Sequence, residues 1–133
     1  MKKLLGILSA LLFIQPMVAD GARVDFQNEI IPILTKVGCN AGACHGAAIG
    51  RGGFNLSLYG GNPEADFDAI VHYMGGRRIN LSKPEESLIV LKPTFAIEHG
   101  GKFLLDDDDE ATQLLLRWIR QGAPKDSSRE LTK

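Results

Sequence analysis

Two cysteines and a histidine are the residues of this chain whose types and spacing could do chemistry. Cys39 and Cys44 are the only cysteines, and His45 directly follows the second. Two cysteines two residues apart, followed by histidine, are the signature of covalent haem attachment: both thiols add to the haem vinyl groups and the histidine binds the iron. Here four residues separate the cysteines, but the Cys44–His45 adjacency that places the iron ligand is kept. The spacer residues are small, and Gly42 predicts a tight turn that brings Cys39 back toward its vinyl group.

Other chemistries use the same residue types. A disulfide between Cys39 and Cys44 is feasible in an oxidising compartment, and from spacing alone it stays open beside haem attachment. Zinc needs about four ligands, whereas the mature chain offers two cysteines and three scattered histidines. A redox dithiol would have two residues between its cysteines and an alternating strand–helix context, which this sequence lacks.

Length and charge bound the function classes. The chain has 133 residues, 15 basic and 16 acidic, so we expect one domain with no basic footprint for nucleic acid. Lys2 and Lys3 precede an apolar run that is too short to span the roughly 30 Å core of a bilayer. We therefore predict a signal peptide over residues 1–19, with an uncleaved anchor as the alternative. The mature protein is then periplasmic or otherwise exported, without a membrane partner, as one domain over residues 20–124 and a polar tail over 125–133.

Apolar residues at three- and four-residue spacing predict an all-α domain of three or four helices with long loops. The expected helices run from Asp25 to Gly38 with a distortion at Pro32, from Pro63 to Met74, from a capping box at Ser82 to a stop before Pro93, and from the acidic run 106–110 to Gly122. Trp118 is expected in the core. The loop over residues 46–62 leaves that core small, and a bound prosthetic group would complete it.

Three segments carry a resemblance that extends from about residue 24 to residue 124. They are Phe26–Leu34 followed by Cys44-His45-Gly46, the stretch Lys83-Pro84-Glu85-Glu86-Ser87-Leu88, and the ending Leu116–Pro124. Together they resemble c-type cytochrome domains, in particular the planctomycete-type cytochrome c-like family of exported proteins. The resemblance implies a small cytochrome c-like fold around one covalently bound haem c. It also implies a carrier of single electrons between redox partner proteins, which is not itself an enzyme.

The same resemblance directs attention to the second axial ligand of the iron. Relatives of this type commonly use a methionine between the two last motifs, and His99 occupies that place here. His99 is therefore the expected distal ligand opposite His45. Met74 is the rival, although its helical spacing favours core packing. His72 is expected to form a surface pair with Asp68.

Bis-histidine ligation would leave the haem at a lower reduction potential than methionine ligation and would saturate the iron. Arg77 and Arg78 could hold the haem propionates by charge-assisted hydrogen bonds, with a solvated helix end as the alternative. Two other functions stay open. One is a haem-based sensor with a vacant sixth position, and the other is a haem-free interaction domain closed by a disulfide.

Overall fold

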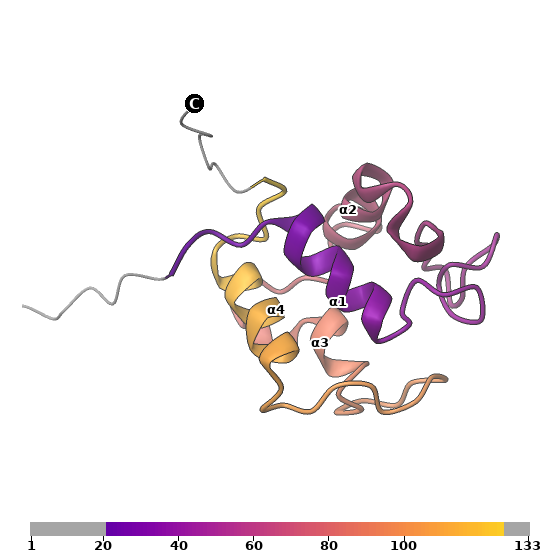
Figure 1. Cartoon of the computed structure of the whole chain (residues 1–133). Helices are drawn as coiled ribbons and strands as arrows, with labels where there is room; N and C mark the ends of the chain where they lie inside the picture. Colours follow the sequence, from indigo (N-terminus) through magenta and orange to yellow (C-terminus); the bar gives the residue numbers. More distant parts are fainter. Residues whose placement is uncertain (1–20, 127–133) are drawn as a thin grey trace, which may run out of the picture.

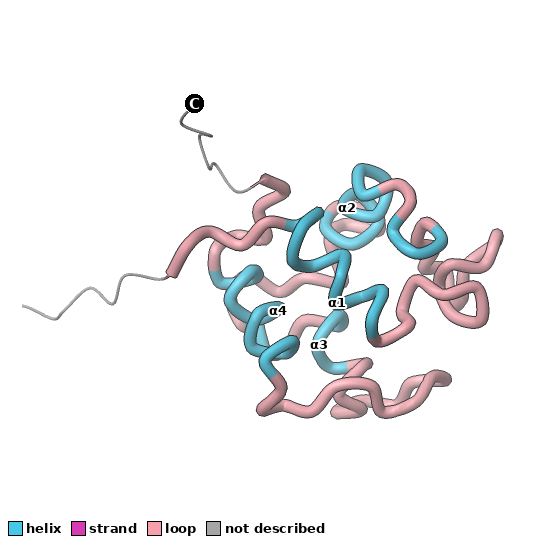
Figure 2. Tube along the Cα trace, viewed as in Figure 1, coloured by secondary structure: helices cyan, strands magenta, loops and turns pink. Residues whose placement is uncertain are grey.

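The computed structural model describes residues 21–126, and this part of the chain is all-α, as predicted (Figure 1). Four α-helices and short turns of 3-10 and π-helix alternate with long loops, and no β-strand occurs within these residues (Figure 2). The predicted signal peptide lies outside the described residues, as do residues 127–133 of the predicted tail. No helix within residues 21–126 is both long enough and apolar enough to cross a membrane.

The first helical segment combines a π-helical turn, Phe26–Ile30, with helix α1, Ile31–Lys36. Asp25 caps it as predicted, because its side chain accepts a hydrogen bond from a backbone N–H of the first turn at 2.8 Å. The expected distortion at Pro32 takes the form of the π-helical turn. Since Pro32 sits in the first turn of α1, its missing N–H costs no hydrogen bond within that helix.

Helix α2, Pro63–Val71, is shorter than predicted. Asn62 caps its start, accepting a hydrogen bond from the Ala65 N–H at 3.2 Å. Beyond the helix, Met74 has a φ of 56° and a side chain exposed to 55%. The prediction that Met74 packs in the core was therefore wrong, because the backbone leaves the helix before the apolar spacing reaches this residue.

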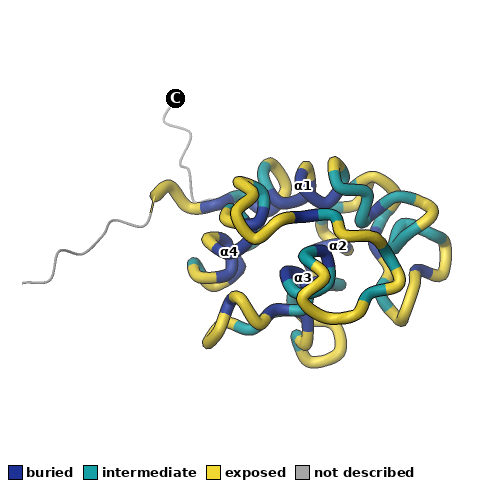
Figure 3. The backbone as a smooth tube through the Cα atoms, turned by 90° about the horizontal axis from the view of Figure 1, so that it is seen from below, coloured by how far each residue is buried: buried dark blue, intermediate teal, exposed yellow. Residues whose placement is uncertain are grey.

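Helices α3, Leu88–Leu91, and α4, Glu110–Arg120, complete the set. The capping box predicted at Ser82 does not form; the Asn80 side chain instead accepts from the Ser82 and Lys83 N–H groups at 3.1 and 3.0 Å. Helix α4 begins in the acidic run, as predicted. Each of the four α-helices carries buried residues, while the loops are a mixture of exposed and half-buried residues (Figure 3).

Trp118 on α4 is fully buried and joins two distant parts of the chain. Its ring lies 5.5 Å from that of Phe26, and its Nε1–H donates to the Pro124 carbonyl at 2.8 Å. The core position predicted for Trp118 is confirmed. The contact fixes the end of the domain against the start of the first helical segment.

Replacing Trp118 with phenylalanine is expected to lower the free energy of unfolding by about 1–3 kcal/mol, because the buried Pro124 carbonyl loses its donor. Denaturant unfolding of the wild type and the variant measures this difference. An unchanged midpoint would mean that water replaces the indole N–H at this position.

Candidate functional site

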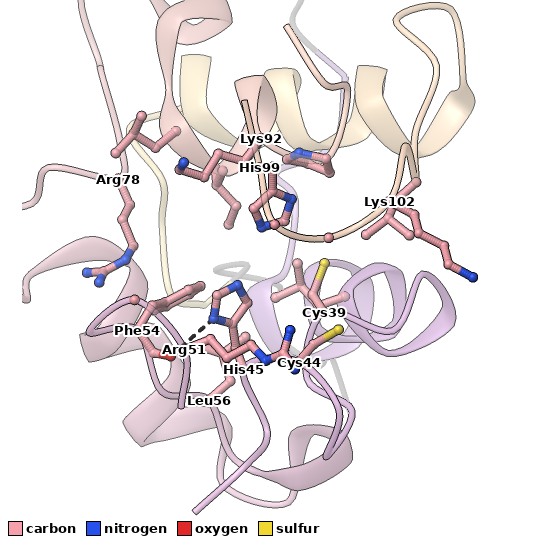
Figure 4. Close-up of a pocket in the computed structure, with 18 of the residues that line it drawn as sticks. Cys39, Cys44, His45, Arg51, Phe54, Leu56, Arg78, Lys92, His99 and Lys102 are labelled. Atoms are coloured by element: carbon pink, nitrogen blue, oxygen red, sulfur yellow. Dashed lines mark hydrogen bonds between the residues drawn. The ribbon is translucent and has the colours of Figure 1, made fainter. Parts of the chain in front are cut away.

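A cavity of about 790 Å³ opens between the loop that follows α1 and the segment that follows α3 (Figure 4). Its apolar wall comes from elements that are distant in the sequence. The apolar lining residues include Leu34, Phe54, Leu56, Leu88, Ile89 and Leu104. Cys39, Cys44, His45 and His99 line the same space. The structure thus brings together the two thiols and the two histidines that the sequence singled out.

The four-residue spacer between the cysteines is folded back by backbone hydrogen bonds. The His45 N–H donates to the Cys39 carbonyl at 2.9 Å, and the Gly46 N–H donates to the Ala41 carbonyl at 3.0 Å. Both cysteines are half-buried free thiols at the cavity. Gly42 was expected to provide the tight turn, but it does not adopt a positive φ; Gly38, directly before Cys39, does, with a φ of 83°.

Two residues that sequence reasoning missed hold the spacer in place. Asn40 is fully buried, and its side-chain N–H donates to Thr35 Oγ1 at 2.8 Å. The Asn40 carbonyl accepts from the Tyr59 N–H at 3.1 Å. Gly46 lies so close to this carbonyl that a Cβ there would lie 2.7 Å from the Asn40 carbonyl carbon. Neither role has a signature in the sequence, because both arise from the chain packing against itself.

The Cys39 thiol is protonated at neutral pH. Burial, with a smaller contribution from the neighbouring Cys44, raises its pKa to about 11. A buried thiol of this kind is a poor nucleophile for thiolate chemistry. Cys39 is therefore not the low-pKa cysteine that a dithiol oxidoreductase requires.

His45 is oriented by a backbone carbonyl. Its Nδ1 lies 3.1 Å from the Phe54 oxygen; since a carbonyl only accepts, Nδ1 carries the proton and Nε2 is left bare. Figure 4 shows this second nitrogen directed across the cavity toward His99. The two imidazole rings are 12° from parallel, with centroids 6.1 Å apart.

His99 lies in a loop that is closed at its base. The Leu104 and Leu105 N–H groups donate to the Pro93 carbonyl at 2.9 and 3.2 Å. Gly101 packs against the imidazole, where a Cβ would lie 3.0 Å from the ring. His99 Nδ1 is buried without a hydrogen-bond partner. Among residues 21–126, packing and not a hydrogen bond at Nδ1 therefore positions this ring.

Both histidines are disposed to be neutral. Burial lowers the pKa of His45, and the charge on nearby His99 adds to that effect. Burial also lowers the pKa of His99, with the Lys92 ammonium as a further cause. A neutral imidazole is the form that binds a metal.

The charged residues that line the cavity are all cations. They are Arg51, Arg77, Arg78, Lys92 and Lys102, and no Asp or Glu is among the lining residues. Arg77 is exposed, whereas Arg78 is buried and donates to two backbone carbonyls. Sequence reasoning found the two adjacent arginines and missed the others, because Arg51 lies in the loop after α1 whereas Lys92 and Lys102 lie in the segment between α3 and α4.

The rival ligands Met74 and His72 lie elsewhere. Both line a neighbouring depression beside α2 and not the cavity. His72 forms the predicted surface pair, with its Nδ1 2.9 Å from Asp68 Oδ1 and both side chains exposed.

Within residues 21–126, no three His, Cys, Asp or Glu side chains are grouped so that they could hold a metal ion by themselves. Comparison of the chain with protein-family models, with curated proteins and with solved structures finds no match.

Proposed function

We propose that this protein is an exported c-type cytochrome that carries single electrons on one covalently bound haem. The observation that carries the proposal is the facing pair of imidazoles, His45 and His99, across a cavity bordered by Cys39 and Cys44. Thiols, ligands and apolar walls are the parts that such a cofactor needs in one place.

The separation of the histidines fits an iron held between them. Imidazole nitrogens bind metals at roughly 2.0–2.1 Å, so a metal held end-on between two imidazoles places the ring centroids about 6 Å apart. The observed 6.1 Å between the two nearly parallel rings agrees with this geometry. A haem supplies its own four equatorial nitrogens, so two protein ligands suffice and no larger cluster is required.

The composition of the cavity wall also fits a haem. The aliphatic and aromatic side chains match an apolar macrocycle, and the cations without a neighbouring carboxylate match its two propionates. Arg77, Arg51 and Lys102 are available for that role, and so is Lys92, although its Nζ also donates to the Glu98 carbonyl at 3.3 Å. Arg78 is less available, because two of its N–H groups are already bound to the backbone.

Each residue then has a separate task. Cys39 and Cys44 hold the cofactor covalently, and the Nδ1–H···O bond of His45 keeps its other nitrogen directed into the cavity. His99 closes the opposite side, and the apolar wall excludes water. Bound there, haem would supply one-electron chemistry by Fe(III)/Fe(II) cycling. Because His45 and His99 would both hold the cofactor, the site would serve electron transfer to redox partner proteins and not the binding of a substrate.

Intact mass spectrometry of the denatured protein, expressed with export and a cytochrome c maturation system, tests the proposal. The expected result is the mature polypeptide plus one haem. A bare polypeptide short of two hydrogens would establish the Cys39–Cys44 disulfide and overturn the proposal.

Single-thiol variants sharpen the same experiment. Cys39→Ala and Cys44→Ala should each retain one thioether at most, and the pyridine haemochrome spectrum should shift because one vinyl group stays unsaturated. The double variant should release all haem on denaturation. Haem that still resists denaturation in the double variant would overturn the assigned tethers.

A further inference from the structure

Arg78 is the most deeply buried cation at the cavity, with 6% of its surface exposed. A buried charge is costly unless hydrogen bonds satisfy it. The guanidinium donates from Nη1 to the Ala69 carbonyl at 3.0 Å and from Nη2 to the Gly53 carbonyl at 3.2 Å. Arg78 therefore ties the last turns of α2 to the loop that passes beneath the cavity.

The flat faces of the same guanidinium are also used. Its central carbon lies 4.2 Å from the centroid of the Phe54 ring and 5.6 Å from that of Tyr73. A cation over an aromatic face is attractive, more so when both are shielded from water. Arg78 thus contacts Gly53 through its carbonyl and Phe54 through its ring, and these are consecutive residues.

Phe54 is also the residue that orients His45. Its carbonyl accepts the Nδ1–H of His45, and its ring centroid lies 4.6 Å from that of the imidazole (Figure 4). The position of this carbonyl sets both the tautomer of His45 and the direction of Nε2. A residue that fixes Phe54 on two sides therefore controls the ligand without touching it.

We propose that Arg78 is a positioning residue for His45: by holding Gly53 and Phe54, it keeps the Phe54 carbonyl where it accepts the Nδ1–H, so that Nε2 stays free for the cavity. As a claim about iron ligation, this inference rests on the proposed function. As a claim about the tautomer of His45, it concerns the polypeptide alone and does not depend on haem binding. The two claims can therefore fail separately.

Nuclear magnetic resonance of the full-length mature protein, labelled with ¹⁵N-histidine, reads the state of His45 directly. Long-range ¹H–¹⁵N correlations, recorded in the reduced state if haem is present, should show one tautomer with protonated Nδ1 in the wild type. Arg78→Gln and Arg78→Lys should speed exchange of that proton roughly fivefold. In haem-free protein, where Nε2 is not bound to iron, the two variants should also mix the tautomers. Lysine keeps the charge, but it cannot bond both carbonyls and lie flat on the ring.

Arg77→Gln is the matched control, since it removes a neighbouring charge at the same cavity and leaves the contacts of Arg78 with Gly53 and Phe54 in place. Its His45 signals should equal those of the wild type. In the haem-loaded protein, Arg77→Gln and Arg78→Gln should both lower the reduction potential by removing a positive charge. A shift in Arg78→Lys, whose charge is unchanged, would come through His45.

Two results would overturn the inference. One is an Arg78→Lys variant whose His45 has the wild-type tautomer and the wild-type rate of Nδ1 proton exchange. The other is an equal rate of that exchange in Arg77→Gln and Arg78→Gln. If Arg78→Gln does not fold, Arg78→Lys and Phe54→Leu carry the test, because the latter keeps the carbonyl but loses the stacking. A protein without haem that still shows the Arg78-dependent tautomer would refute the proposed function and leave the positioning role standing.

Discussion

Replacing His99 with alanine is expected to convert a protein that excludes carbon monoxide in its reduced form into one that binds it readily. The two imidazoles face each other at the spacing expected for a metal held between them, so removing one opens an axial position. The visible spectrum of the reduced protein, recorded before and after addition of carbon monoxide, measures the change. The reduction potential of the variant should change as well, since axial ligand identity is a main determinant of it.

The two rival ligands provide matched controls for that experiment. His72→Ala and Met74→Ala remove the other described histidine and the methionine beside it, both of which line the depression outside the cavity. Both variants should have the wild-type spectrum and should not bind carbon monoxide. If either opened the iron while His99→Ala did not, the assignment of the distal ligand would be refuted.

The wild-type protein is informative in the same assay. Ready carbon monoxide binding without any substitution would mean that His99 does not hold the sixth position. The haem-based sensor would then replace the electron carrier as the better function. The closed base of the His99 loop, with two N–H groups on the Pro93 carbonyl, is the reason to expect the opposite result.

Local patterns in the sequence were enough to predict the structural features that depend only on residues close together in the chain. The Asp25 cap, the start of α4 in the acidic run and the His72–Asp68 pair were all predicted and are present. The end of α2 was missed, because the apolar spacing continues beyond Val71 while the backbone does not. Helical periodicity indicates where a helix is possible, and tertiary packing decides where it ends.

The residues of the candidate site likewise fall into those that the sequence predicted and those that it did not. The cysteine–histidine motif identified Cys39, Cys44 and His45 from adjacency, and the resemblance identified His99 from its place between two motifs. Arg51, Lys92, Lys102 and the Phe54 carbonyl were missed, because residues far apart in the sequence meet only in the folded chain. A backbone carbonyl has no sequence signature at all, and yet this one decides which nitrogen of His45 is free.

The spacer between the cysteines is the least ordinary part of the chain, and Gly46, two residues after Cys44, packs directly against its backbone. Replacing Gly46 with alanine is expected to lower the free energy of unfolding by about 3 kcal/mol, at the upper end of overpacking costs. The new Cβ would press on the carbonyl group of Asn40 and lie 3.0 Å from the carbonyl carbon of Ala41. These are backbone atoms that cannot rotate away, so the fold of the spacer itself must shift.

Gly42→Ala is the control for this variant, since it adds the same methyl group within the spacer itself. The nearest atom to its Cβ is a Leu58 methyl carbon at an ordinary 3.7 Å, so it should fold and mature as the wild type does. Denaturant unfolding and the yield of covalent haem per polypeptide measure both variants. Gly46→Ala should lose stability and most of the doubly tethered haem together, because the Cys39 carbonyl and the His45 N–H are joined across this spacer. Equal behaviour of the two variants would show that the spacer tolerates displacement, and that the backbone bonds closing it do not set the position of the thiols.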